Sequence, residues 1–166
     1  MTQKLQLKKE WYEAKGTLRY SPQRLGGEES QKWWLVIDCQ DDISEYYRHV
    51  IHIESYKTLK LQKPYWGSHI TVIRNEEPPN QELWKKYDGQ EIVFKYGNHI
   101  GTNYSPERWK SFWWLDSRCE WALDIREELG LRREPYPQFH LTIGNITDEQ
   151  NRRDFKLRDL HGRKLS

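Results

Sequence analysis

Two stretches of the chain repeat one pattern, and this pattern is the strongest indication of the fold. They read Pro64-Tyr65-Trp66-Gly67-Ser68-His69-Ile70-Thr71-Val72 and Pro135-Tyr136-Pro137-Gln138-Phe139-His140-Leu141-Thr142-Ile143. When the stretches are aligned, Pro, Tyr, His and Thr fall at the same four positions, and an aliphatic residue follows each His and each Thr. This alternation of polar and apolar residues is typical of a half-buried β-strand.

The alternation places each His and its Thr on the same face of the strand. Successive side chains of a strand point to opposite faces. We therefore expect His69 and Thr71 to lie about 6–7 Å apart on one face, while the aliphatic residues point into a core. His140 and Thr142 follow the same rule. Two such strands side by side would present two imidazoles and two hydroxyls to one cleft.

This set of side chains suits chemistry at a phosphate. The unperturbed pKa of histidine is near 6.5, so one imidazole can act as general base and a second as general acid on opposite sides of a phosphorus atom. Two threonine hydroxyls can donate to the non-bridging oxygens. The predicted catalytic residues are His69, Thr71, His140 and Thr142. The chemistry needs no metal ion or cofactor, and we predict none.

The paired H-x-T motifs resemble those of the 2H phosphoesterase superfamily. The resemblance implies an α+β fold, in which two pseudo-symmetric lobes have central antiparallel sheets flanked by helices. It also implies a metal-independent phosphoric diester hydrolase. The alternative interpretation is that both motifs are ordinary strands, each carrying a surface histidine or one with its hydrogen bonds satisfied.

A narrower resemblance covers residues 66–76, which are similar to the first motif region of small phage 2H proteins. That group includes the anti-CBASS nuclease, which degrades cyclic di- and trinucleotide messengers of bacterial defence. The resemblance implies cleavage of 3′–5′ linkages in cyclic oligonucleotides, with His69 and His140 as the acid–base pair and Thr71 and Thr142 as phosphate contacts. One histidine would deprotonate a 2′-hydroxyl and the other would protonate the leaving 5′-oxygen. The sequence does not assign these two roles.

Aromatic residues beside the motifs are weaker candidates for substrate binding. Tyr65, Trp66 and Tyr136 flank the motifs and could stack on a base, although the two tyrosines could instead close the loop before each strand. Arg74 lies at odd spacing from His69, so we expect it at the rim, contacting phosphate or solvent. Within residues 109–114, some aromatic side chains must be core and others could line the site.

Composition restricts the partner without identifying it. The net charge is only +2, which favours a small substrate over long RNA. Nine Trp and ten Tyr suit base stacking, but they also suit a small core or an oligomer interface. Two other functions remain open. One is a 2′,3′-cyclic nucleotide phosphodiesterase acting on RNA ends, and the other is a non-catalytic protein that sequesters a nucleotide. No obligate protein partner is evident.

Two cysteines, no recognisable secretory signal and no long apolar run predict a protein of the cytoplasm, or of the host cytoplasm if the gene is viral. Cys39 and Cys119 are expected to be free thiols. A nucleophilic cysteine activated by a histidine is an alternative that no motif supports. His49 and His52 have a spacing that metal ligands can use, but surface histidines are commoner. We expect one domain over residues 1–166, with a loose N-terminus to about residue 10 and a charged tail from 152.

Local patterns predict the secondary structure. Strands or extended segments are expected over 11–20, 31–39, 58–61, 91–96 and 109–116 and over both H-x-T stretches. Helices are expected from Asp41 or Asp42 to about Ile51, over 81–87, over 118–129 with Ser117 as cap and Gly130 as stop, and after a capping box at 147–150. A turn is expected at Gly97-Asn98.

Overall fold

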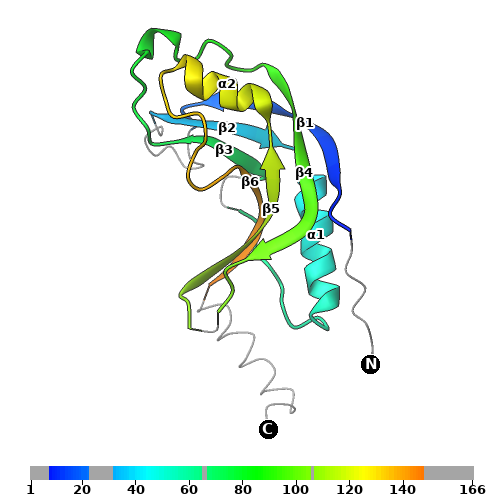
Figure 1. Cartoon of the computed structure of the whole chain (residues 1–166). Coiled ribbons are helices and arrows are strands. Elements are labelled where there is room, and N and C mark those ends of the chain that lie inside the picture. The colour runs from blue at the N-terminus through cyan, green and yellow to red at the C-terminus, as the bar shows by residue number, and fades with distance from the viewer. Residues whose placement is uncertain (1–7, 23–31, 65–66, 106, 148–166) are drawn as a thin grey trace.

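A computed structural model describes residues 8–22, 32–64, 67–105 and 107–147 of the 166-residue chain. In order, the elements are β1 (Trp11–Tyr20), β2 (Trp34–Cys39), α1 (Asp41–Glu54), β3 (His69–Arg74), the 3₁₀ turn η1 (Gln81–Leu83), β4 (Glu91–Thr102), β5 (Lys110–Arg118), α2 (Glu120–Glu128) and β6 (His140–Thr147). Figure 1 shows their arrangement. The strand regions are rich in β-branched and aromatic residues, which favour a half-buried sheet.

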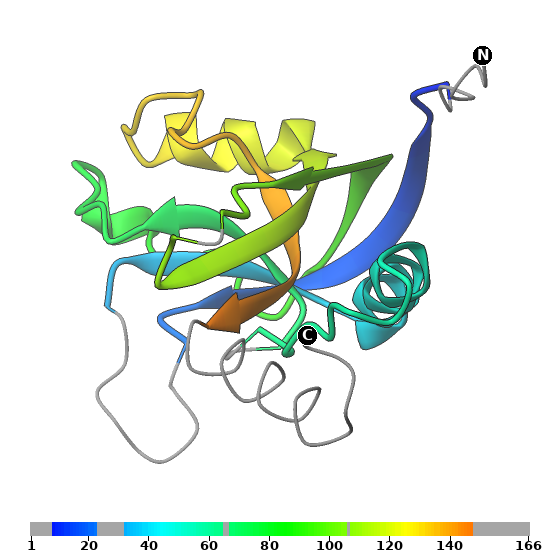
Figure 2. The same ribbon diagram turned by 90° about the horizontal axis from the view of Figure 1, so that it is seen from below.

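The strands form one closed antiparallel barrel in the order β1-β2-β3-β6-β5-β4. The predicted α+β fold of two lobes flanked by helices is therefore wrong. The described residues contain only two short α-helices, which lie on different sides of the barrel (Figure 2). The barrel closes because β1 pairs with β4 from Trp11↔Gly97 to Thr17↔Glu91, which joins the two halves of the chain through backbone hydrogen bonds.

The order of elements nevertheless repeats. β1-β2-α1-β3 is followed by β4-β5-α2-β6, with η1 between the two sets. Exchanging the first set for the second reverses the strand order of the barrel and leaves the neighbours unchanged. The two halves are thus related by an approximate two-fold that passes between β3 and β6, where Ile70 pairs with Leu141.

A single hydrophobic core fills the space between the strands and the helices. The aliphatic residues of both motif strands belong to this core, as predicted. The helices pack crosswise, with α1 lying on β6 and α2 lying on β3. Each motif strand is therefore supported by the helix of the other half. Side chains from both halves contribute to the core, including Leu35, Ile37, Ile51, Ile70, Val72, Leu115, Ile125, Leu141 and Ile143.

One strand prediction and one turn prediction are wrong. Residues 58–61 form no strand, and only Gln62 makes an isolated bridge, to Asn145. The predicted turn at Gly97-Asn98 is also wrong, because β4 continues through it to Thr102. At this point β4 has β1 on one side and β5 on the other, and an irregularity in the β4–β5 register absorbs the bend.

Helix ends differ from the sequence prediction at three places. Only the 3₁₀ turn η1 forms within 81–87. Ser117 lies in β5 rather than at a helix cap, since α2 begins at Glu120. Asp41 and Asp42 are the first residues of α1 instead of its cap, and their charges favour the first turn. Gly130 ends α2 as predicted, with φ of +85°.

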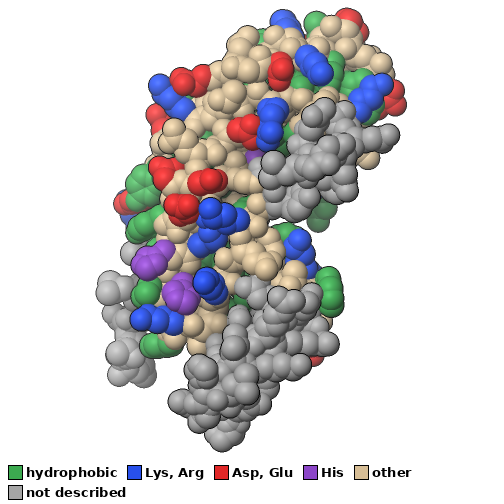
Figure 3. Space-filling model, turned by 180° about the vertical axis from the view of Figure 1, so that it is seen from behind, with side chains coloured by type: hydrophobic (Ala, Val, Ile, Leu, Met, Phe, Trp, Pro, Cys, Tyr) green, Lys and Arg blue, Asp and Glu red, His purple; other side chains and the backbone are tan. Residues whose placement is uncertain are grey.

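The predicted capping box falls mainly at 148–150, outside the described residues, as does the tail from 152; Thr147 itself ends β6. No helix within the described ranges is long and apolar enough to span a membrane. On the face shown in Figure 3, acidic and basic side chains are interspersed. This face therefore presents no continuous field of one sign.

Candidate active site

The crossing of β3 and β6 brings the two H-x-T motifs together. Ile70 pairs with Leu141, and both are fully buried. Antiparallel pairing around this contact sets His69 opposite Thr142 and places Thr71 opposite His140. Because side chains alternate, both histidines and both threonines lie on the face opposite the core. All four are half-buried. The sequence-predicted set is therefore assembled at one point of the sheet.

The same hydrogen bond orients each imidazole. His69 Nδ1 lies 2.9 Å from the Gly67 carbonyl oxygen, and His140 Nδ1 lies 2.8 Å from that of Gln138. A carbonyl oxygen only accepts, so each Nδ1 carries a proton. A neutral ring held in this way has its lone pair on Nε2. Nε2 is therefore the atom through which either ring would exchange a proton with a ligand.

Matched backbone contacts hold the residue that precedes each histidine. The Cys39 N–H donates to the Ser68 carbonyl at 2.9 Å, and the Ser117 N–H donates to the Phe139 carbonyl at 3.0 Å. Ser68 and Phe139 are both buried. The start of each motif strand is thus pinned to the strand beside it, which fixes the position of the imidazole that follows.

An aspartate lies across from each histidine, and sequence reasoning missed both of them. Asp38 on β2 is the register partner of His69, and Asp116 on β5 is the partner of His140. Each aspartate forms a salt bridge, Asp38 with Arg19 at 2.7 Å and Asp116 with Lys9 at 3.4 Å. Each aspartate follows a run of apolar strand residues, which predicts its place in a strand but does not indicate which residue lies opposite it.

Burial lowers the pKa of His69. The Gly67 carbonyl and Asp38 counteract this effect in part, while the positive charges of Arg19 and Arg74 add to it. Burial also raises the pKa of Asp38, although Arg19 opposes that shift. The lowered pKa favours a neutral His69 ring at pH 7, which is the form that accepts a proton.

Two arginines donate hydrogen bonds to the motif strands at the points where the pairing between β3 and β6 ends. Arg126 of α2 donates from Nη1 to the Val72 carbonyl at 2.9 Å, and Arg48 of α1 donates from Nη1 to the Ile143 carbonyl at 2.8 Å. Val72 and Ile143 are the residues that follow the two motif threonines. Since β3 and β6 share a single register pair, these donors supply hydrogen bonds where the strands separate.

Arg126 also forms the strongest ion pair of this region. The side chain of Arg126 is 1% exposed, and its guanidinium binds both carboxylate oxygens of Glu76, at 2.7 and 2.9 Å. Its Nε donates to the Arg132 carbonyl. The bidentate contact lowers the pKa of the Glu76 carboxyl. This network joins α2 to the segment that follows β3.

The second half adds an aromatic ring to the site. Trp114 on β5 is the register partner of Thr142, and its ring centroid lies 6.4 Å from that of His140. In the first half, the register partner of Thr71 is Val36. The sequence predicted that some aromatic residues within 109–114 would be core and others would line the site, and the structure places Trp113 in the core and Trp114 on the site face.

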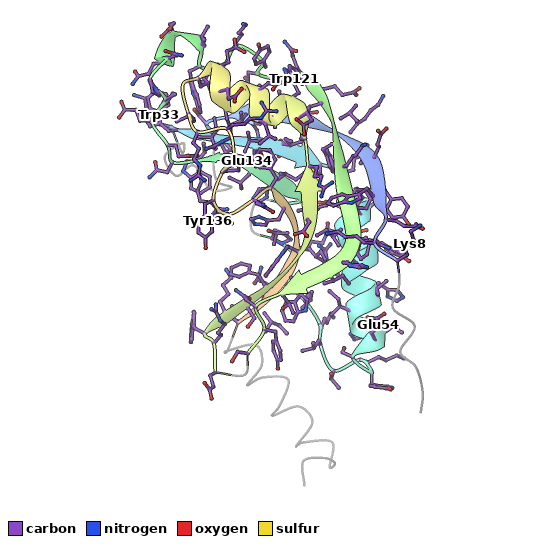
Figure 4. The ribbon with its side chains drawn as sticks, in the orientation of Figure 1. Lys8, Trp33, Glu54, Trp121, Glu134 and Tyr136 are labelled. Atoms are coloured by element: carbon purple, nitrogen blue, oxygen red, sulfur yellow. The ribbon has the colours of Figure 1, made fainter. Side chains whose placement is uncertain are left out.

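The weaker sequence candidates have different positions. Tyr65 and Trp66 fall outside the described residues. Tyr136 is 95% exposed and projects from the segment before β6 (Figure 4). Arg74 is exposed at the end of β3, and its guanidinium lies 5.4 Å from the ring centroid of Trp34. That stacking accounts for its position at the rim.

Other candidate residues have structural explanations. His52 Nδ1 lies 2.9 Å from the Leu59 carbonyl, so this ring closes the segment after α1. Among the described residues, no three His, Cys, Asp or Glu side chains are grouped as a metal site would require. Both cysteines are free thiols. Burial raises the pKa of Cys39 to about 12 and also raises that of Cys119, which makes both poor nucleophiles.

A cavity of about 270 Å³ lies beside the site. Its wall includes Asp116, the register partner of His140, and Gln138, whose carbonyl accepts from His140 Nδ1. Trp11, Arg118 and Phe139 also line it. Neither His140 nor Thr142 lines it. The cavity therefore adjoins the residues that position His140 and is separate from the histidine–threonine cluster itself.

Comparison with known proteins gives no family assignment, because no family model, curated protein or solved structure matches the chain.

Proposed function

We propose that this protein is a phosphodiesterase that cleaves 3′–5′ linkages of cyclic oligonucleotide messengers by two-histidine acid–base catalysis. The observation that carries the proposal is the crossing of β3 and β6. There, two imidazoles whose Nδ1 atoms are hydrogen-bonded to backbone carbonyls lie beside two threonine hydroxyls. The resemblance of the two H-x-T motifs to 2H phosphoesterases supports the same chemistry.

The reaction follows from this arrangement. One histidine takes the proton of the ribose 2′-hydroxyl through Nε2, and the 2′-oxygen attacks the neighbouring phosphorus. The P–O5′ bond breaks, and the second histidine, which enters this step as an imidazolium, gives its Nε2 proton to the leaving 5′-oxygen. The hydroxyls of Thr71 and Thr142 donate to the non-bridging oxygens, where negative charge accumulates. His69 suits the role of base, since burial favours its neutral form.

The size of the substrate is inferred from charge. The sequence carries a net charge of +2, and a long nucleic acid would be held by a continuous basic surface. A cyclic di- or oligonucleotide carries few phosphates and needs no such surface. Both cysteines are free thiols, which is typical of a reducing compartment, so we place this activity in the cytoplasm, or in the host cytoplasm if the gene is viral.

The direct test is turnover of 3′,3′-cyclic GMP–AMP in the presence of EDTA. We expect the wild type to release a linear product that ends in a 2′,3′-cyclic phosphate. His69→Ala and His140→Ala should each lower the rate by about 10²–10⁴-fold, the usual contribution of a general acid or base. His99→Ala is the matched control, because His99 is exposed on β4 away from the crossing.

Other outcomes would identify the alternatives. Turnover that survives both histidine replacements would overturn the two-histidine mechanism, and dependence on added metal would overturn its metal independence. Cleavage of 2′,3′-cyclic AMP without cleavage of the cyclic dinucleotide would indicate an RNA-end enzyme. Tight binding of the cyclic dinucleotide without turnover, unchanged in His140→Gln, would indicate a sequestering protein.

A further inference from the structure

We propose that Trp114 is a stacking platform for one nucleobase of the substrate, the base of the nucleoside on the β5–β6 side of the scissile phosphate. The inference rests on the proposed function and names a binding residue for that same site. Three observations carry it: the position of Trp114 beside Thr142, the packing of its indole on a glycine, and the absence of an equivalent ring at the matching position of the first half.

The register places Trp114 within the site. Its partner on β6 is Thr142, so the two side chains leave the sheet on the same face. The centroids of the Trp114 and His140 rings are 6.4 Å apart, and the ring planes are inclined by 65°. A phosphate held by Thr142 and His140 would therefore have the indole as its neighbour along β5, where the attached nucleoside can reach it.

Gly101 explains how the indole is held. Gly101 on β4 is the other register partner of Trp114. A Cβ at Gly101 would lie 2.5 Å from Nε1 and 2.6 Å from Cε2 of the indole, closer than real Cβ contacts allow. The ring thus packs directly on the β4 backbone. The indole is only partly buried, so part of its surface stays accessible to a flat ligand.

The first half has a different residue at this position. Val36 is the partner of Thr71, as Trp114 is the partner of Thr142, and Val36 is fully buried. A valine offers no flat surface to a base. The two threonines are therefore flanked unequally, and the nucleoside beside Thr142 is the one whose base is stacked.

A nucleobase is the ligand chemistry that fits this arrangement. The hydroxyl and imidazole groups of the site suit a phosphate. The Trp114 ring lies beside them, 6.4 Å from the His140 ring between centroids, where the base attached to that phosphate could stack. Stacking of a base on an aromatic side chain contributes about 5- to 150-fold in affinity and tolerates any base, because every base has a π-face. Trp114 should strengthen binding of nucleotides without selecting strongly among them.

Calorimetric titration with AMP and with ribose 5-phosphate tests the platform, because the two probes share a phosphate and a ribose and differ by the base. We expect the wild type to bind AMP at least about fivefold more tightly than ribose 5-phosphate. Trp114→Leu should abolish this preference, whereas Trp114→Phe should retain part of it. Trp109→Leu is the control, since Trp109 lies just before β5 and is 67% exposed.

Gly101→Ala provides a second test, because the added methyl group would displace the indole without removing it. The preference for AMP over ribose 5-phosphate should fall in this variant too. A preference that is unchanged in a folded Trp114→Leu variant, or absent from the wild type, would overturn the proposal. Photocrosslinking of 2-azido-AMP to the unmodified chain covers the case in which the variants do not fold. Labelling of the Trp114 peptide would support the platform, and labelling confined to other peptides would overturn it.

The two proposals fail in different ways. Loss of AMP preference in Trp114→Leu without any phosphodiesterase turnover by the wild type would leave the platform standing and remove the proposed reaction. Turnover that depends on both histidines, with no difference between AMP and ribose 5-phosphate, would do the reverse.

Discussion

The two halves of the barrel hold their histidines with the same backbone contacts but surround them with different side chains. Four contacts match between the halves: the histidine Nδ1 bond to the carbonyl two residues earlier, the N–H bond to the residue before the histidine, the aspartate opposite the histidine, and the arginine on the carbonyl after the threonine. The frame of the site is therefore nearly symmetric.

The side chains around this frame differ in burial and charge. Asp38 is bound by Arg19 at 2.7 Å, whereas Asp116 is bound by Lys9 at 3.4 Å in a more exposed pair. Thr71 is flanked by Val36 and Thr142 by Trp114. A symmetric frame supplies two proton-transfer groups, and the unequal surroundings let the two sides of one phosphate be treated differently. Substitutions at the shared contacts and at the unshared ones should therefore have different effects.

After the two histidines themselves, the two threonines have the largest expected effect. Thr71→Val and Thr142→Val should each lower kcat for the cyclic dinucleotide by about 10²–10³-fold, the usual cost of losing one donor to a developing oxyanion. Thr→Ser at either position should retain most of the rate, because the hydroxyl remains. Steady-state kinetics measure this, with Thr58→Val outside the barrel as control. Equal activity of the valine and serine variants would contradict the phosphate-binding role.

The two crossed arginines should contribute unequally to stability. Arg126→Met removes a buried cation from Glu76, a carboxylate that is 38% exposed, so we expect a loss near the lower end of the usual range, about 3 kcal/mol in the free energy of unfolding. Arg48→Met removes one hydrogen bond to the Ile143 carbonyl and should cost about 1 kcal/mol. Urea unfolding measures both, and equal losses would contradict the comparison.

Acid sensitivity separates the same two arginines. Arg126 lowers the pKa of the Glu76 carboxyl from its ordinary value of 4.5. A depressed carboxyl pKa contributes stability that is present above 4.5 and is lost as the pH falls through the folded-state pKa. Arg126→Met should therefore flatten the stability profile below pH 4.5, and Arg48→Met should leave that part of the profile unchanged. Urea midpoints measured across this range test the prediction.

The smallest expected effect is on the titration of His69. Burial lowers the pKa of this imidazole and the charge of Asp38 raises it, so Asp38→Asn should lower the pKa further. Because a lowered imidazole pKa means that protonation opposes folding, the variant should also lose stability as the pH falls below 6.5. NMR titration of the His69 Cε1–H signal measures the shift. Glu54→Gln, at the end of α1, is the control (Figure 4).

Local pattern was enough to predict the parts of the site that lie within one strand. The alternation around His69 and His140 predicted two strands with His and Thr on one face and aliphatic residues in the core, and both features are present. Gly130 was recognisable as a helix stop because glycine after a helical run commonly ends the helix, and its φ of +85° is a conformation that favours glycine. These features depend on residues adjacent in sequence.

The contacts between segments could not be predicted in this way. Nothing local to Asp38, Arg126 or Trp114 indicates that each would lie beside a motif residue of another strand. The fold class was predicted wrongly for the same reason, since the pairing of β1 with β4 closes one barrel in place of two lobes. The pleat of a strand decides which face a side chain occupies. Only strand register and helix packing decide which distant side chain becomes its neighbour, and they depend on burying one core shared by both halves.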